Sequence, residues 1–400
     1  MCFGVHLHTF FLQFQPFPLS LSALRSAVSA PKAKNWTAIL APYAAKLNKA
    51  KNAFAVLAHE GTQAIARAYG ATASYMQLPC TNGNAAPCVN GSTHELSFSK
   101  NGKHLWITQM IAQKVYHFDV VAGNVVESSR KTFNFPMQPH GIVADGDNAW
   151  ATLEVPTATN ALIKIDANGM TLQQINLASG TGPHGLAKAG DGMLWFAGKE
   201  GSVVGSANPE TGQVTYYPLA SNSTPIYIHA AKNGDIWFTE LTASKIGRIR
   251  EGQLTEIDLP IKNSRPISIE TSATGSVYVT LEAANSMGYI PSKEARGPSS
   301  GLRTEVIKQI FVGTPGVKPA GGAFTPTGQF WFGASAADEM IKLPAPFVLL
   351  STLIQIEDDA LIQIPEGTSG STYHRAAYMG HKMFWTELST DRVGYLKGAL

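Results

Sequence analysis

Short runs of alternating apolar and polar residues recur along most of this chain, and they follow one order of motifs. A unit begins with a proline and small residues, passes through a Gly-containing turn and enters a strand rich in aromatic residues. A strand of the type Lys245–Ile249 follows, and then an outer strand such as Val214–Leu219. Alternation with a period of two predicts half-buried β-strands, and the Asp-Gly and Asn-Gly pairs predict tight turns. Four short strands per unit is the composition of a β-propeller blade.

The unit occurs seven times. The prolines that open five of the units are 44, 42, 41 and 53 residues apart, and they are Pro139, Pro183, Pro225, Pro266 and Pro319. Seven aromatic strands align, and they carry Trp106, Trp150, Trp195, Trp237, Tyr278, Trp331 and Trp385. We therefore predict an all-β fold, a seven-bladed β-propeller over residues 71–400.

The ring is expected to be closed by a strand from the other end of the propeller. The last unit reaches Leu400 with only three strand patterns, and the fourth pattern appears ahead of the first unit, in Ala73–Pro79. This segment resembles the outer strand Leu254–Pro260. An N-terminal strand that completes the last blade would remove two exposed sheet edges.

Three segments depart from the repeat. Residues 31–70 are rich in alanine, with apolar residues at helical spacing, and predict a short helical N-terminal extension. Pro291–Arg303 is polar and rich in Gly and Pro, which predicts an insertion loop in the fifth blade. Pro344–Ile364 is expected to lengthen the sixth blade, partly as strands.

Composition narrows the class of protein without changing the fold. Of 400 residues, 44% are hydrophobic and 15% are charged, which allows a large core. The net charge is +3 and no run of Lys and Arg occurs, so we expect neither a nucleic-acid partner nor a polybasic membrane site. No stretch approaches the ~20 apolar residues that span a membrane. No Gly-x-Ser-x-Gly elbow or phosphate-binding glycine loop is present.

Several weak signals together predict a protein of the secretory pathway, or one that is secreted. Residues 1–30 contain an apolar segment, Phe10–Leu24, followed by the small-x-small triplet Val28–Ala30 of a signal peptide. The alternatives are a disordered tail or an incorrect start. Cys80 and Cys88 form an even pair that predicts a disulfide. Sequons for N-glycosylation begin at Asn35, Asn90 and Asn222.

Candidate catalytic and binding residues are expected at one mouth of the central channel of the predicted ring. In an antiparallel blade, the start of the innermost strand lies beside the end of the aromatic strand. This places His94, His140 and His184 at equivalent positions of three neighbouring blades, with Glu154 close by. We assign these four residues as candidate catalytic groups. Candidate substrate-binding residues at the same mouth are Gln109, Gln138, Tyr227, Glu240, Tyr373 and His374. The alternative is structural: the histidines bond backbone groups, and the glutamates cap turns or pair with Lys245 and Arg248.

Two motifs carry a resemblance to a known family. Trp237–Glu240 with Lys245–Ile249, together with Pro-His-Gly-Ile at residues 139–142, resembles the virginiamycin B lyase (streptogramin lyase) propellers over residues 73–400. The resemblance implies elimination, rather than hydrolysis, that opens a cyclic depsipeptide. It further implies a histidine pair on adjacent blades and Mg²⁺ held by carboxylates. His94 and His140 match the histidine pair, and Glu154 matches one carboxylate.

One residue departs from the family pattern. Gln138 stands where the family has a glutamate before Pro-His, and a neutral amide binds Mg²⁺ less well than a carboxylate. An alignment on His140 and His184 instead places Gly182 and Lys199 at the carboxylate positions. The chain also resembles fungal propellers of secondary metabolism, some of which are hetero-Diels–Alder cyclases.

Three hypotheses for function follow. The first is a metal-independent enzyme of secondary metabolism that dehydrates, eliminates or cyclises a small-molecule substrate, without a cofactor. The second is a Mg²⁺-dependent C–O lyase of the streptogramin type. The third is a non-catalytic propeller that binds a ligand or a protein.

Overall fold

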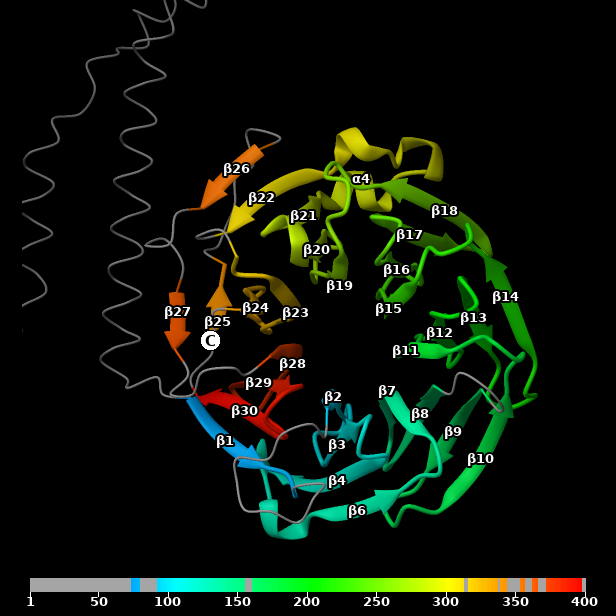
Figure 1. The fold of residues 1–400 in the computed structure, drawn as a ribbon, viewed down its shortest axis with the longest axis vertical. Helices are drawn as coiled ribbons and strands as arrows, with labels where there is room; N and C mark the ends of the chain where they lie inside the picture. The colour runs from blue at the N-terminus through cyan, green and yellow to red at the C-terminus, as the bar shows by residue number, and fades with distance from the viewer. Residues whose placement is uncertain are drawn as a thin grey trace, which may run out of the picture. The chain divides into compact units, whose positions relative to one another are not determined.

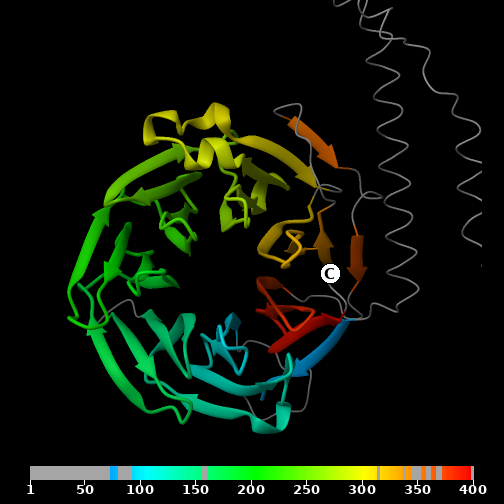
Figure 2. The same cartoon turned by 180° about the vertical axis from the view of Figure 1, so that it is seen from behind.

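The computed structural model describes residues 73–79, 92–154, 160–312, 316–336, 339–343, 353–356, 362–365 and 372–397. Seven sheets stand around a common centre in this part of the chain, each with its first strand innermost (Figure 1). The prediction of a seven-bladed β-propeller is confirmed. The same ring is seen from behind in Figure 2.

The first four blades follow the chain. Blade one contains β2 (Thr93–Phe98), β3 (His104–Gln109), β4 (Lys114–Val121) and β6 (Lys131–Asn134), with the short β5 (Asn124–Val125) on β4. Blade two contains β7 (Gln138–Asp145), β8 (Asn148–Glu154), β9 (Ala161–Ile165) and β10 (Thr171–Asn176). Blade three contains β11 (Pro183–Lys188), β12 (Leu194–Gly198), β13 (Val203–Ala207) and β14 (Val214–Pro218). Blade four contains β15 (Pro225–Ala230), β16 (Ile236–Glu240), β17 (Lys245–Arg250) and β18 (Gln253–Asp258).

The last three blades contain the irregular features. Blade five contains β19 (Pro266–Thr271), β20 (Val277–Leu281), β21 (Ser286–Ile290) and β22 (Lys308–Val312). Blade six contains β23 (Pro319–Phe324), β24 (Phe330–Ala334), β25 (Glu339–Lys342) and β27 (Ile362–Pro365). Blade seven contains β28 (Tyr373–Met379), β29 (Lys382–Glu387), β30 (Arg392–Lys397) and β1 (Ala73–Gln77).

Strand β1 closes the ring as predicted. It pairs antiparallel with β30, from Ala73 opposite Leu396 to Gln77 opposite Arg392, and Figure 1 shows the two strands side by side. Met76 is 3% exposed, and it packs in one cluster with Phe384 of β29. The closing strand therefore adds apolar contacts as well as hydrogen bonds to the last blade.

The repeated motif is explained by packing within each blade. The second strands bring large aromatic side chains into the core, and Trp106, Trp150, Trp237 and Trp385 are fully buried. In blades three and four, the third strand carries a glycine beneath a phenylalanine ring. A Cβ at Gly247 would lie 1.8 Å from the Phe238 ring, and one at Gly205 would lie 2.1 Å from the Phe196 ring. Only glycine fits at these two positions.

Two interpretations of the insertions need correction. Pro291–Arg303 is not a plain loop, because it contains the short helix α4 (Ser292–Arg296) and a 3₁₀ turn at Ser299–Gly301. Arg248 of blade four donates to the carbonyl oxygen atoms of Ala295 and Gly297, which holds the insertion in place. The second insertion does not only lengthen blade six. Its strand β26 (Leu353–Ile356) pairs parallel with β22 of blade five, while β27 completes blade six.

Several predictions lie outside the described residues. These are the signal peptide at 1–30, the helical extension at 31–70, the Cys80–Cys88 disulfide and the sequons at Asn35 and Asn90. Asn222 is described, and it is exposed in the turn between β14 and β15. None of the described helices has the length and apolar character that crossing a membrane requires.

The role of β1 can be tested with Met76→Ala. We expect the free energy of unfolding to fall by about 2–4 kcal/mol, because a buried side chain is lost and a cavity is left at the closing seam. Urea unfolding followed by tryptophan fluorescence measures this change. Leu172→Ala, at a position of β10 that is 47% exposed, is the matched control and should cost less than about 0.5 kcal/mol. Equal stability of the two variants would show that β1 does not hold the last blade.

Candidate active site

Four histidines meet at the centre of the ring. His374, His94, His140 and His184 are near the start of the innermost strands of blades seven, one, two and three. Neighbouring ring centroids are 3.8 Å apart between His374 and His94, and 3.5 Å apart in the next two pairs. The sequence placed His94, His140 and His184 together as candidate catalytic residues and His374 at the same mouth as a candidate binding residue, and the structure brings all four into one cluster. We call these four residues the histidine cluster.

A repeated threonine positions the histidine cluster. The innermost strands of blades one, two, three and seven each have a register irregularity near their start, which leaves one backbone N–H without a ladder partner. In blade two, Thr152 Oγ1 accepts this bond from Gly141 N at 2.8 Å and donates to the His184 carbonyl oxygen at 2.9 Å. Thr108 and Thr386 make the equivalent bonds to the carbonyl oxygen atoms of His140 and His94. Each threonine thus bonds its own blade to the histidine of the next.

The glycine of the Pro-His-Gly motif is explained by the close approach of the neighbouring innermost strand. A Cβ at Gly141 would lie 2.5 Å from the carbonyl oxygen of His184, and one at Gly185 would lie 2.6 Å from that of Ile226. Both contacts are with backbone, which cannot move aside without separating the blades. The glycine therefore lets neighbouring innermost strands approach closely.

The histidine cluster is neutral at neutral pH. Burial lowers the pKa of all four imidazoles well below 6.5, and each also lies close to cationic or histidine neighbours that lower it further. His184 Nδ1 lies 2.7 Å from the Ile226 carbonyl oxygen and donates to it, so Nε2 is the basic nitrogen. Nδ1 of His94 and of His140 has no hydrogen-bond partner among the described residues. Neutral rings with free nitrogen atoms can accept a proton.

A carboxylate and a lysine lie on the outer side of His140. Glu154 ends β8 and stands opposite Gln138 of β7. Its Oε2 is 3.5 Å from His140 Nε2, and its Oε1 accepts a hydrogen bond from Lys199 Nζ at 2.8 Å. Burial raises the pKa of Glu154, and the charge and hydrogen bond of Lys199 oppose that rise. These residues form a short polar chain that leads from the solvent to the histidine cluster.

A second layer of polar side chains crosses the centre of the ring. Arg375 Nε donates to Glu95 Oε1 at 2.6 Å, and the guanidinium lies 4.3 Å from the Tyr227 ring centroid. The Tyr227 hydroxyl donates to Glu270 Oε1 at 2.7 Å, and the other oxygen of Glu270 is 2.9 Å from His229 Nδ1. Burial and the neighbouring Glu270 raise the pKa of Tyr227 well above its ordinary value. Blades one, seven, four and five are thereby linked through their side chains.

Sequence reasoning missed Glu95 and Arg375 as members of this site, and it placed Lys199 at a carboxylate position without giving it a role. A signal for the first two was present, because they occupy the position that is glycine in the Pro-His-Gly units. Blade four carries Tyr227 at the same position, and the structure brings Glu95, Arg375 and Tyr227 together at the centre of the ring. The signal for Lys199 was its equivalence with Glu154 one blade further on.

Three predicted binding residues lie apart from the histidine cluster. Gln109 is buried, and its amide is bonded to Thr93 and Tyr116 within blade one. Tyr373 is buried against Trp385. Glu240 is buried near Glu256 and Lys245, and burial with the Glu256 charge raises its pKa to about 8.

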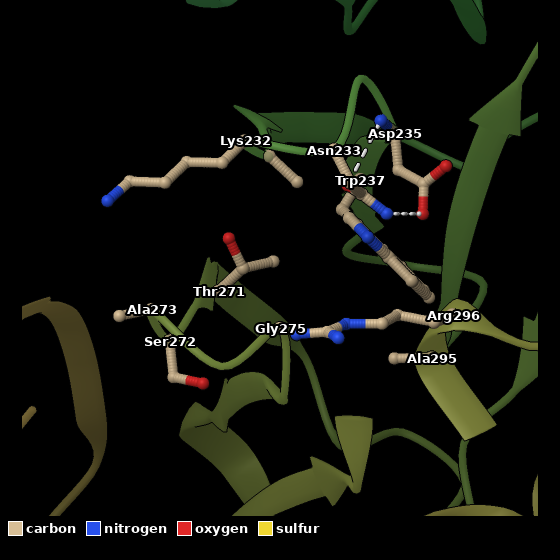
Figure 3. Close-up of a pocket in the computed structure, with 11 residues that line it drawn as sticks. Lys232, Asn233, Asp235, Trp237, Thr271, Ser272, Ala273, Gly275, Ala295 and Arg296 are labelled. Atoms are coloured by element: carbon tan, nitrogen blue, oxygen red, sulfur yellow. Dashed lines mark hydrogen bonds between the residues drawn. The ribbon is translucent and has the colours of Figure 1, made fainter. Parts of the chain in front are cut away.

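A separate cavity of about 210 Å³ lies at the turns between the first and second strands of blades four and five. Figure 3 shows Lys232, Trp237, Thr271 and Arg296 around it, and the bond from Asn233 to Asp235 beside it. These turns are at the opposite ends of the strands from the histidine cluster. This cavity is therefore not part of the candidate active site.

Comparison with known proteins decides the family. The model of the virginiamycin B lyase family matches residues 41–343. The chain belongs to this family. Virginiamycin B lyase of Nocardia farcinica (strain IFM 10152) is 28% identical over 206 residues, which is 50% of this chain and 67% of that protein.

Solved structures agree on the fold of this family member. A catalytically inactive virginiamycin B lyase from Staphylococcus aureus, crystallised with quinupristin, has a TM-score of 0.66 at 18% identity, over 82% of this chain and 99% of that one. A streptogramin B lyase structure has a TM-score of 0.65 at 20% identity, over 82% of this chain and 97% of that one. At these identities the likeness shows the fold alone.

The residues at the mouth do not fit the Mg²⁺ that the family implies. Mg²⁺ takes oxygen ligands, usually carboxylates. Beside His140 the described residues offer one carboxylate, Glu154, and the residue opposite it is the amide Gln138. Lys199 Nζ already occupies the cation position on Glu154 Oε1. The nearest further donors are the imidazoles of the histidine cluster, which suit softer metals than Mg²⁺, and Glu95 beside His94, which is already paired with Arg375.

The histidine cluster predicts a loss of stability in weak acid. A lowered pKa in the folded state means that the unfolded chain binds more protons between that pKa and 6.5. The free energy of unfolding should therefore fall as the pH drops below about 6.5, by up to ~1.4 kcal/mol per pH unit for each histidine. The raised pKa values of Glu95, Glu154 and Glu240 act in the opposite direction, and the lowered pKa of His117 acts with the cluster, so five histidines outnumber three carboxyl groups.

Urea unfolding between pH 7.5 and 5 measures this slope. His374→Gln removes one buried titrating ring, so its slope should be shallower than that of the wild type, whatever its stability at pH 7.5. His381→Asn is the control, because His381 is exposed with a left-handed φ of 61° that asparagine also adopts. Equal slopes in all three proteins would contradict the assignment of buried neutral imidazoles.

Proposed function

We propose that this protein is a carbon–oxygen lyase that opens the ester of a small cyclic depsipeptide, or of a related small molecule, by elimination. The observation that carries the proposal is the buried, neutral His140 beside Glu154 and Lys199, in a member of the virginiamycin B lyase family. The quinupristin complex of the Staphylococcus aureus protein supports the choice of substrate class.

The proposed step needs one base and no water. A ring nitrogen of His140 removes a proton from the carbon next to a carbonyl group, and the electron pair of that C–H bond forms a C=C bond. The C–O bond of the ester breaks, and the oxygen leaves with its electron pair as a carboxylate. His140 then returns the proton to solvent. Glu154, 3.5 Å from Nε2, stabilises the imidazolium that exists between these events.

The rest of the histidine cluster has a supporting role in this proposal. His94 and His184 flank His140 on both sides, and their rings hold its orientation. Both are neutral, whereas burial and the charges of Lys199 and Arg375 lower the pKa of His140. The second layer contacts the cluster through Arg375, whose guanidinium donates to the His374 carbonyl oxygen at 3.3 Å.

A hetero-Diels–Alder cyclase is a second candidate. Gln138 and Lys199 in place of a carboxylate pair favour it, because cyclisation of a quinone methide requires no metal. In this reading His140 and Glu154 would expel hydroxide from a benzylic alcohol, and the mouth would orient the product for ring closure. Loss of water from such a precursor, seen by mass spectrometry, would favour the cyclase over the lyase.

Mass spectrometry of the reaction with quinupristin tests the proposed lyase. We expect a linear product of unchanged mass, because elimination adds no water, whereas hydrolysis would add the mass of one water molecule. His140→Ala should lower kcat/KM by about 10²–10⁴-fold, which is the usual contribution of a general base. His381→Asn should keep the wild-type rate. Unreduced turnover by His140→Ala would overturn the assignment of the base, and a hydrated product would overturn elimination.

We also propose that the protein enters the secretory pathway. The exposure of Asn222 in a turn supports this, since an acceptor asparagine must be accessible. Expression in a eukaryotic host should give a product that loses mass on treatment with a glycosidase. Asn222→Gln should lower the mass of the untreated protein by one glycan, and identical masses of the two proteins would argue against use of this site.

A further inference from the structure

We propose that the ammonium group of Lys199 supplies the positive charge that a Mg²⁺ ion, held by a pair of carboxylates, would otherwise supply. The inference rests on the proposed lyase function and specifies how its site is charged. The charge would face the substrate oxygen atoms on which negative charge develops during elimination.

The place of Lys199 in the fold supports this role. Gln138 and Glu154 face each other at the mouth of blade two. In blade three the equivalent residues are Gly182 and Lys199, and Lys199 N donates to the Gly182 carbonyl oxygen at 2.9 Å. The two positions that would hold a second carboxylate opposite these residues are therefore an amide and a glycine, and the other carboxylate near Lys199 Nζ is the exposed Glu200, at 3.9 Å.

Blade three leaves little room for a carboxylate at residue 182. Gly182 has a left-handed φ of 55°, which side chains rarely adopt. A Cβ there would also lie 2.4 Å from Cγ of Glu200. A metal-ligating side chain is therefore disfavoured at the position opposite Lys199.

The side-chain exposures place Lys199 between the solvent and the proposed base, His140. Its side chain is 33% exposed, that of Glu154 is 9% exposed and that of His140 is 2% exposed. A substrate that enters the mouth therefore meets the ammonium group before it meets the imidazole. Lys199 also bears on the basicity of the cluster, because its charge lowers the pKa of His94, His140 and His184.

The alternative is an ordinary ion pair between Lys199 and Glu154. Such a partly exposed pair contributes little to stability, and its loss would not create or remove a dependence on Mg²⁺. Dependence of activity and of binding on Mg²⁺ therefore separates the two roles.

The experiment compares four proteins with quinupristin, in EDTA and in added Mg²⁺, and measures Mg²⁺ binding by calorimetry. The wild type should keep its full rate in EDTA and bind no Mg²⁺ at the mouth. Lys199→Met should lose about 10²–10³-fold in kcat, the usual effect of removing one group that stabilises developing charge. Lys199→Arg should retain part of the rate. Lys188→Met is the matched control, because Lys188 is a similarly exposed lysine paired with Asp145, and it should keep the wild-type rate.

The double variant Gln138→Glu with Lys199→Gly completes the test. It restores two carboxylate positions and removes the resident cation, so it should bind Mg²⁺ and become active only when Mg²⁺ is present.

Mg²⁺ binding by the wild type, abolition of its activity by EDTA, or full activity of Lys199→Met would overturn the proposal. If no protein turns over quinupristin, the lyase proposal fails for that substrate, but calorimetry still decides the charge proposal. Binding by the double variant and not by the wild type supports it, and equal binding by both refutes it.

Discussion

The arrangement of the candidate active site depends on one hydrogen-bonded contact, the threonine bridge between neighbouring innermost strands. The hydroxyl of Thr152 joins Gly141 of its own blade to the His184 carbonyl of the next blade, and Thr108 and Thr386 repeat the bond around the ring. A buried backbone N–H without a hydrogen-bond partner costs folding free energy. Each bridge therefore also pairs an N–H that the strand irregularity would otherwise leave without a partner. Four imidazoles can meet at the centre because their backbones are held in register by these bridges.

The centre of the ring combines two kinds of polar layer. In the histidine cluster, burial keeps the groups neutral and leaves proton acceptors free. In the second layer, Arg375 is paired with Glu95 and covers Tyr227, and Glu270 joins Tyr227 to His229. Opposite charges are satisfied by each other there, which makes burial tolerable. The ring thus holds neutral imidazoles beside charges that are paired with each other, and the proposed proton transfer uses the neutral layer.

The sequence alone predicted most of the fold, because the same local pattern of strand period and turn residues is repeated in every blade. The aromatic strands, the seven units and the closing strand at Ala73–Gln77 all follow from strand period and turn residues. The equivalent positions of His94, His140 and His184 followed from the same alignment. The pairing of β26 with blade five did not, because it depends on where an insertion returns in space. The contact between Arg375 and Tyr227 lay beyond sequence reasoning for a similar reason, since it joins blades that are not neighbours.

The closing strand also constrains how this protein can reach its native state. The partners Ala73 and Leu396 are about 320 residues apart along the chain, so β1 has no partner until nearly all of the propeller has been synthesised. Contacts of such long range are slow to form, and an unpaired strand edge invites association with other chains. Folding of the ring therefore becomes cooperative when the last blade is completed. Until β1 pairs with β30, the open edge of that blade is the place where an incompletely folded molecule is most exposed to aggregation.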